Sequence, residues 1–189
     1  LQMLEMTVNP SQLAAANTLE TYCGPTESTL AYRVLRVKTA GGESNAVSLG
    51  VVNQVSDQET EPNEAVEKAQ PISVPASISA RFNRPGDIDG FRFQAKKGEK
   101  IWIEVQSQRL HQPTDPAFVV QQLTQDKEGV WKTRDLKTAT DVVSPAGNFR
   151  IPFASEDAAL LFEAPSDGDF RVLVRDEYGA ADLTQTLCY

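Results

Sequence analysis

Two short acidic segments contain the side chains of this chain that are best suited to bind a cation. The first is ETEPNE at residues 59–64 and the second is GDIDG at residues 86–90. Their oxygen-bearing side chains are Glu59, Glu61, Asn63, Glu64, Asp87 and Asp89. Carboxylates crowded in this way repel one another unless a positive charge lies among them. Ca²⁺ takes about six to eight oxygen ligands at roughly 2.3–2.6 Å, so the two segments predict a calcium site.

The spacing within each segment supports this interpretation. In an extended chain, side chains two residues apart point to the same side. Glu59, Glu61 and Asn63 can therefore direct their oxygens to one side, and Asp87 and Asp89 can do the same. If the two segments face each other, they form an oxygen-rich cage. Three or four of the carboxylates suffice to bind the ion.

A second interpretation of the same residues needs no metal. Acidic linkers are commonly solvated, and Asn63 is a suitable N-cap for a short helical turn over residues 64–69. Glu64 at the start of that turn would interact favourably with the helix dipole. The aspartates of GDIDG can also accept hydrogen bonds from the backbone of their own turn.

Composition limits the classes of partner. The 189 residues carry a formal net charge of -8, and no run is rich in lysine or arginine, so nucleic acid and anionic lipid are not expected partners. No apolar run reaches the roughly 18 to 20 residues of a membrane span. The first residue is Leu1, from which we expect a segment of a longer protein. Cys23 and Cys188 are either one bridge between the two ends or two unpaired thiols.

Hydrophobic residues alternate with a period of two through most of the chain, which predicts strands. In FRFQA, Phe91 and Phe93 share a face, and in KIWIEVQS the apolar stripe excludes Trp102. Further short runs of this kind are ISVPASISA, AFVVQQL, FRIPFA, ALLFEA and DFRVLVRD, which are separated by turn sequences such as RPGD and KKGE. The pattern predicts an all-β protein, an antiparallel β-sandwich of jelly-roll type.

Three regions follow from the change in composition along the chain. Residues 1–53 are β-like but short for an independent two-sheet domain, and we interpret them as a partial immunoglobulin-like β module. Residues 54–70 are polar and acidic and read as a linker. Residues 71–189 hold the predicted β-sandwich.

Four stretches occur in an order that resembles a known family. They are ETEPNEAVEKAQPI, GDIDGFRFQAKKGEKIWIEV, PTDPAFVV and ALLFEAPSDGDFRVLVRDEYGAADL. Together, over about residues 57–187, they resemble the bacterial pre-peptidase C-terminal (PPC) domain, to which clostridial collagenase collagen-binding domains are similar. The stretch AYRVLRVKTAGGESNAVSLGVV is similar to the last strands of an IPT/TIG immunoglobulin-like module.

The resemblance implies a non-catalytic jelly-roll sandwich in secreted, multidomain bacterial proteins. In the collagen-binding members, an acidic linker and an Asp-rich turn hold calcium together. The positions that match this pattern here are Glu59, Glu61, Asn63, Glu64 and Asp89. Asp87 is a looser match, because those members carry a longer Asp-rich turn than GDIDG.

Catalytic patterns are missing from the sequence. His111 is the only histidine and lies in a loop-like stretch, so we interpret it as an exposed loop residue. The sequence contains no GxSxG, HExxH or GxxxxGK[ST] pattern, and we expect no enzyme within these residues. Trp102 is the candidate for contact with a ligand such as a sugar or a peptide, and its alternative is packing under a loop or against the N-terminal module.

The function predicted from these observations is a binding or spacer module of a large secreted bacterial multidomain protein, with calcium stabilising the linker. The alternative is an accessory or processing domain of a secreted peptidase whose catalytic domain lies elsewhere. The expected location is secreted, periplasmic or at the cell surface. The expected partners are neighbouring domains of the same chain and an extracellular protein or polysaccharide, with no nucleic acid and no membrane insertion.

Overall fold

The computed structural model divides the chain into two compact units, Leu1–Asn53 and Gln54–Tyr189. It describes residues 3–7, 32–39, 42–50, 55–143 and 154–177. The first unit contains the strands β1 (Met3–Thr7), β2 (Tyr32–Thr39), β3 (Gly42–Glu43) and β4 (Val47–Gly50). Strand β2 pairs in parallel with β1 and antiparallel with β3 and β4, so the described part of this unit is a small mixed sheet.

The described part of the second unit is built from strands and one short 3₁₀ helix, η1 (Gln108–Leu110). Its strands are β5 (Asp57–Gln58), β6 (Gln70–Pro71), β7 (Ile78–Ser79), β8 (Ile88–Ala95), β9 (Lys100–Glu104), β10 (Pro116–Gln125), β11 (Trp131–Ala139), β12 (Asp141–Val143), β13 (Ala154–Glu163) and β14 (Gly168–Asp176). The predicted all-β class is therefore confirmed, and the jelly-roll type stays a prediction.

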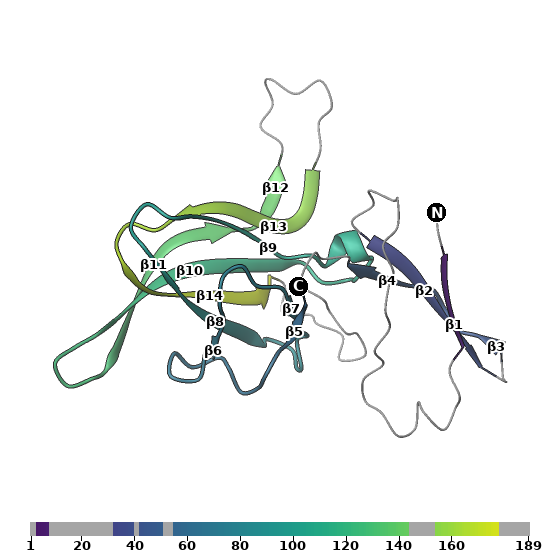
Figure 1. Ribbon diagram of the computed structural model, residues 1–189, viewed down its shortest axis with the longest axis horizontal. Coiled ribbons are helices and arrows are strands. Elements are labelled where there is room, and N and C mark those ends of the chain that lie inside the picture. Colours follow the sequence, from purple (N-terminus) through teal and green to yellow (C-terminus); the bar gives the residue numbers. More distant parts are fainter. Residues whose placement is uncertain (1–2, 8–31, 40–41, 51–54, 144–153, 178–189) are drawn as a thin grey trace. The chain divides into compact units, whose positions relative to one another are not determined.

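Two sheets form the body of the second unit (Figure 1). The five-stranded sheet has the order β11-β10-β14-β8-β6, in which β6 runs parallel to β8 and the other neighbours are antiparallel. The three-stranded sheet has the order β12-β13-β9 and is antiparallel. A further pair, β5 with β7, is parallel.

The hydrophobic core lies between these two sheets. Phe93 and Phe170 come from the five-stranded sheet, and Phe162 comes from the three-stranded sheet. The ring centroid of Phe162 lies 6.2 Å from that of Phe93 and 5.3 Å from that of Phe170, both in edge contacts. Aromatic side chains interdigitating from two facing sheets are the arrangement of a β-sandwich.

The predicted alternation matches the burial of the central strands. Phe91, Phe93 and Phe170 are buried in the core, whereas Trp102 is 60% exposed. Arg171 is an exception, because it stands on the outer face of β14 and yet is only 6% exposed. The first acidic segment, residues 59–64, lies over it, and Arg171 Nη1 donates a hydrogen bond to the Glu64 carbonyl oxygen (3.2 Å).

Two of the predicted strands are not observed over their full predicted length. Of the run at residues 72–80, only Ile78–Ser79 forms a strand, and Val74 and Pro75 form a bend. Proline has no N–H to donate to a strand pairing, which explains the interruption. The run at residues 149–154 lies almost entirely outside the described residues, as do Cys23 and Cys188.

Residues 54–70, interpreted from sequence as an acidic linker, belong to the second compact unit and pair with its strands. Strand β5 pairs with β7, β6 pairs with β8, and Asn63 and Ala69 between them are buried. Within the described residues, no helix is long and apolar enough to cross a membrane.

Candidate metal centre

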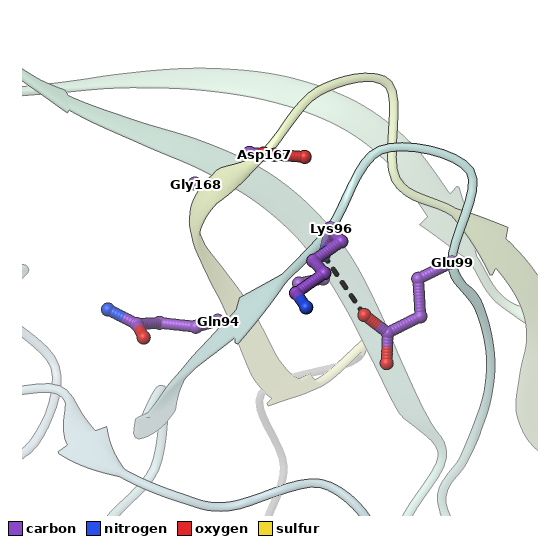
Figure 2. A pocket seen from close by; sticks show the side chains of 6 residues that line it. Gln94, Lys96, Glu99, Asp167 and Gly168 are labelled. Atoms are coloured by element: carbon purple, nitrogen blue, oxygen red, sulfur yellow. Dashed lines mark hydrogen bonds between the residues drawn. The ribbon is translucent and has the colours of Figure 1, made fainter.

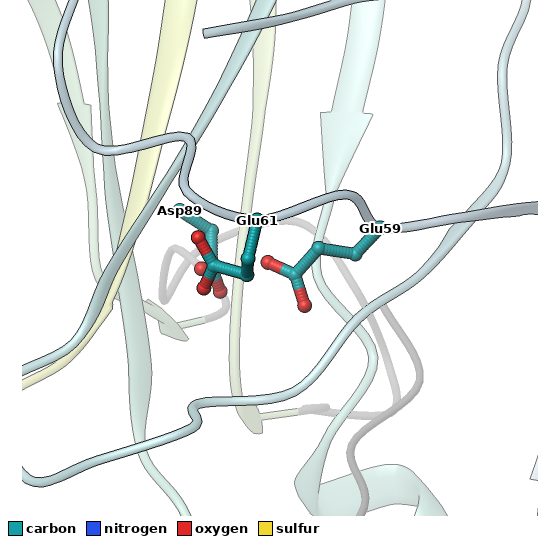
Figure 3. Close-up of side chains that lie close together, drawn as sticks. All are labelled: Glu59, Glu61 and Asp89. Atoms are coloured by element: carbon teal, nitrogen blue, oxygen red, sulfur yellow. The ribbon is translucent and has the colours of Figure 1, made fainter. Parts of the chain in front are cut away.

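Three carboxylates from the two acidic segments converge at one end of the second unit. Glu59, Glu61 and Asp89 each place a carboxylate oxygen within 4.8 Å of those of the other two (Figure 3). Asp89 lies on β8 in alternation with Phe91 and Phe93, which directs its side chain inward. We call these three residues the acidic cluster.

The backbone of the first segment is held in place by neighbouring strands. Glu59 N donates to the Ser79 carbonyl oxygen (3.0 Å), and Arg81 N donates to Glu59 Oε2 (3.0 Å). Glu61 Oε1 accepts from Asn83 Nδ2 (3.0 Å). Each carboxylate oxygen has more than one lone pair, so both glutamates keep acceptor capacity for a cation.

Asp89 differs from the other two members of the cluster. Its side chain is 0% exposed, and neither carboxylate oxygen has a hydrogen-bond partner in the described part of the chain. Burial raises the pKa of Asp89 to about 10, assisted by the adjacent carboxylate of Glu59 and by the charges of Asp87 and Glu61. A buried carboxyl group without a donor is costly, so this position requires either a bound proton or a bound cation.

Asn63 connects the two acidic segments. Its Oδ1 accepts a hydrogen bond from Gly90 N (3.0 Å), and its Nδ2 donates to Glu59 Oε1 (2.9 Å). Its backbone N donates to Glu61 Oε2 (2.9 Å). The single helical turn that follows starts at Ala65, whose carbonyl oxygen accepts from Ala69 N (2.9 Å). Asn63 therefore orients both glutamates and does not cap this turn.

Glu64 and Asp87 are near the acidic cluster but are not members of it. Glu64 forms an ion pair with Arg84 at the surface, and its pKa is lowered by a hydrogen bond with its own backbone and by Arg84. Asp87 Oδ2 accepts from Asn83 N (2.6 Å), and its Oδ1 lies 3.3 Å from Arg84 Nε. Asp87 thus accepts a hydrogen bond from the backbone of its own turn, as the interpretation without a metal expects. Asp89 accepts no such bond.

Sequence reasoning did not identify Arg81, Asn83 or Gly90 as parts of this site. The stretch RPGD was interpreted only as turn chemistry, but the residues just before it donate to both glutamates. An Asn placed one residue before such a turn, close to an acidic pair, is the only local signal. Gly90 has no signal of its own, because its role depends on a segment 27 positions away.

Gly90 allows the acidic segment to lie directly on β8. A Cβ atom at this position would stand 2.6 Å from the Asn63 carbonyl oxygen and 3.3 Å from Leu173 Cδ2. We expect Gly90→Ala to lower the free energy of unfolding by roughly 1–3 kcal/mol, because the backbone of the segment must move. Urea denaturation measures this, with Thr133→Ala on exposed β11 as the control; an unchanged midpoint for Gly90→Ala would show that the segment is not held there.

Trp102 and His111 are both exposed, and neither belongs to the acidic cluster. Trp102 on β9 stands directly opposite Leu161 on β13, which is 56% exposed. His111 is the C-cap residue that follows the helix η1, and its φ of 61° is left-handed.

Comparison of the chain with protein-family models and with curated protein sequences gives no match.

Proposed function

We propose that this chain is a non-catalytic binding or spacer module of a large secreted bacterial multidomain protein, stabilised by Ca²⁺ at the acidic cluster. One observation carries the metal assignment: Asp89 is fully buried beside two other carboxylates, and neither of its oxygens has a partner among the described residues. A cation at this position would supply the missing charge and link the acidic segment to β8.

The chemistry of the donors favours calcium. The cluster offers only oxygen atoms, whereas zinc sites are built mainly from nitrogen and sulfur ligands. Mg²⁺ needs near-octahedral geometry at about 2.0–2.1 Å and keeps much of its water, while Ca²⁺ accepts irregular sets of carboxylates. Glu61 is exposed, so an ion can reach the cluster from solvent.

The resemblance to the PPC domain supports the rest of the proposal. That resemblance implies a non-catalytic module of secreted bacterial proteins, and in the similar collagen-binding domains a calcium site joins an acidic linker to a later Asp-rich turn. The IPT/TIG-like stretch at residues 31–52 belongs to a type of module found in the same kind of protein. The acidic segment follows the boundary between the two compact units, so a cation there would stiffen the connection beside it.

Thermal unfolding in the presence of calcium or EDTA tests the metal assignment. A ligand at 100 times its dissociation constant adds about 2.7 kcal/mol to the free energy of unfolding. For a chain of this size, we expect the melting temperature to be roughly 5–10 °C higher in saturating Ca²⁺ than in EDTA. Equal melting temperatures in millimolar Ca²⁺ and in EDTA would contradict the proposal.

Two glutamates of the same segment provide a matched pair of variants. Glu61→Gln removes one carboxylate of the acidic cluster, and we expect most of the calcium-dependent shift to disappear. Glu64→Gln removes only the surface partner of Arg84, and the shift should persist. Loss of the shift in Glu64→Gln but not in Glu61→Gln would place the ion elsewhere.

A further inference from the structure

A groove with several charged and amide side chains runs along the edge of the five-stranded sheet near the end of β8. It consists of two open cavities of about 360 and 340 Å³ that share Gln94. Figure 2 shows the first of them. Its charged and amide side chains are Arg92, Gln94, Lys96, Glu99, Asp167 and Asp169. We call this the edge groove. Gln94 is five positions beyond Asp89 on the same strand, or roughly 16 Å at about 3.3 Å per residue.

The groove exists because β6 is shorter than its neighbour. The pairing of β6 with β8 ends at Pro71 and Arg92, whereas β8 continues to Ala95. Ile72 N still donates to the Arg92 carbonyl oxygen (2.8 Å), and the chain then bends away at Val74. In the described part of the fold, no strand pairs with Gln94 on this side, which leaves the hollow open to solvent.

Arg92 presents hydrogen-bond donors that the protein does not use. Its guanidinium group makes no hydrogen bond or ion pair with any described residue, although the side chain is only partly exposed. Its Cζ lies 5.6 Å from the centroid of the Trp131 ring, and this cation–π contact restrains the side chain. A restrained and unpaired guanidinium group loses little conformational entropy when a ligand accepts from it.

Acceptors line the groove beside these donors. Asp169 Oδ1 accepts from Gln94 Nε2 (3.3 Å), Asp167 Oδ1 accepts from Lys97 N (2.7 Å), and Glu99 Oε2 accepts from Lys96 N (3.0 Å). In each carboxylate, only one oxygen is used by the described residues. The protein bonds hold these carboxylates in position, and the second oxygens remain available to a ligand.

The charge of the groove indicates which ligand class fits. Arg92 and Lys96 contribute two positive charges, and Glu99, Asp167 and Asp169 contribute three negative ones, so the net charge is -1 on a chain of -8. An anionic polymer would be repelled. A hydroxyl group both donates and accepts, so a polyhydroxylated ligand can use the carboxylates and the cations together.

We propose that the edge groove binds a neutral polysaccharide, through the Arg92 guanidinium group, Gln94 and the free oxygens of Asp167 and Asp169. This rests on the proposed function as a binding module and names its ligand class. Enclosed and mostly apolar pockets suit small molecules, whereas this groove is open and carries six charged or amide side chains, which suits part of a longer hydroxylated chain.

Native affinity electrophoresis of the full chain tests the proposal. The probes are dextran, xylan, galactomannan and mixed-linkage β-glucan as neutral polysaccharides, and alginate as an anionic one. We expect at least one neutral polysaccharide to retard the protein. Arg92→Ala and Gln94→Ala should each weaken that retardation by roughly tenfold, the effect of losing a hydrogen bond that involves a charged or well-placed polar group. A melting curve for each variant establishes that it is folded.

The control and the competing site are exposed residues outside the groove. Lys137→Ala removes an exposed cation on β11 and is the control, because it should bind as the unsubstituted chain does. Trp102→Ala removes the exposed indole on the other sheet that the sequence suggests as a ligand contact, and it therefore tests the competing site. Retardation by no neutral polysaccharide, retardation by alginate alone, or loss of binding in Trp102→Ala but not in Arg92→Ala would each overturn the proposal. The electrophoresis is run in Ca²⁺ and in EDTA. Loss of polysaccharide binding then tests the groove, whereas loss of the calcium-dependent melting shift tests the metal site, and the two results are read separately.

Discussion

Asp89→Asn is expected to stabilise the protein in EDTA and to abolish its stabilisation by Ca²⁺. The substitution keeps the shape of the side chain but removes a carboxyl group that must take up a proton on folding, because no described residue donates a hydrogen bond to it. We expect the free energy of unfolding in EDTA to rise by about 1 kcal/mol or more. The gain of about 2.7 kcal/mol in saturating Ca²⁺ should fall close to zero, because the variant lacks a carboxylate ligand. Urea denaturation in both buffers measures the two effects.

The pH dependence of the cation-free protein provides a second measurement. Because the pKa of Asp89 is raised from 3.8 to about 10 on folding, the folded state holds a proton that the unfolded state has released. The resulting stability is fully present below the unfolded pKa and is lost as pH rises toward the folded one. Within that window, Asp89→Asn should remove a decline of up to about 1.4 kcal/mol per pH unit. A variant that is less stable in EDTA at neutral pH, or that keeps the calcium shift, would contradict this assignment.

Asp157→Asn is expected to destabilise the protein strongly in either buffer. Asp157 on β13 is as deeply buried as Asp89, but its oxygens accept from Ser107 N (2.9 Å), Gln108 N (2.7 Å) and Arg109 Nε (2.8 Å). An asparagine amide group would turn N–H groups toward these donors and leave some of them unpaired. We expect a loss on the order of 3 kcal/mol in urea denaturation.

A matched control for this second prediction is Asp141→Asn, at an exposed position on the neighbouring strand β12. It should change the free energy of unfolding by less than about 0.5 kcal/mol. A mild effect of Asp157→Asn, similar to that of Asp141→Asn, would show that the carboxylate does not hold the helix η1 on β13. The calcium shift should survive in Asp157→Asn, because this residue lies outside the acidic cluster.

The two buried aspartates show why residue type and burial do not by themselves predict a site. Both are 0% exposed and both come from runs with alternating or acidic character. Asp157 faces backbone N–H groups of a segment about 50 positions away, whereas Asp89 faces other carboxylates. The same substitution is therefore expected to have opposite effects on stability in EDTA.

Strand prediction succeeded where one face of a strand is buried and the other is exposed. Phe91 and Phe93 on β8 and Phe170 on β14 follow that pattern and lie in the core. Strand β11 was not predicted, because it is an edge strand whose residues 132–135 are all exposed, so no apolar alternation marks it. Arg171 broke the pattern because a segment more than 100 positions away covers it.

The sequence by itself determined the all-β class, the inward faces of the central strands and the two acidic segments, because each depends on residues that are close together in the chain. Only the tertiary structure decided that Glu59 and Glu61 meet Asp89, that Glu64 pairs with Arg84, and that Arg92 is restrained by Trp131. Local spacing indicates which face of a strand is buried, but the hydrogen-bond partner of a given side chain is set by long-range packing, about which local spacing carries no information. That packing is the reason why Asp89 has no hydrogen-bond donor and lies close to two other carboxylates.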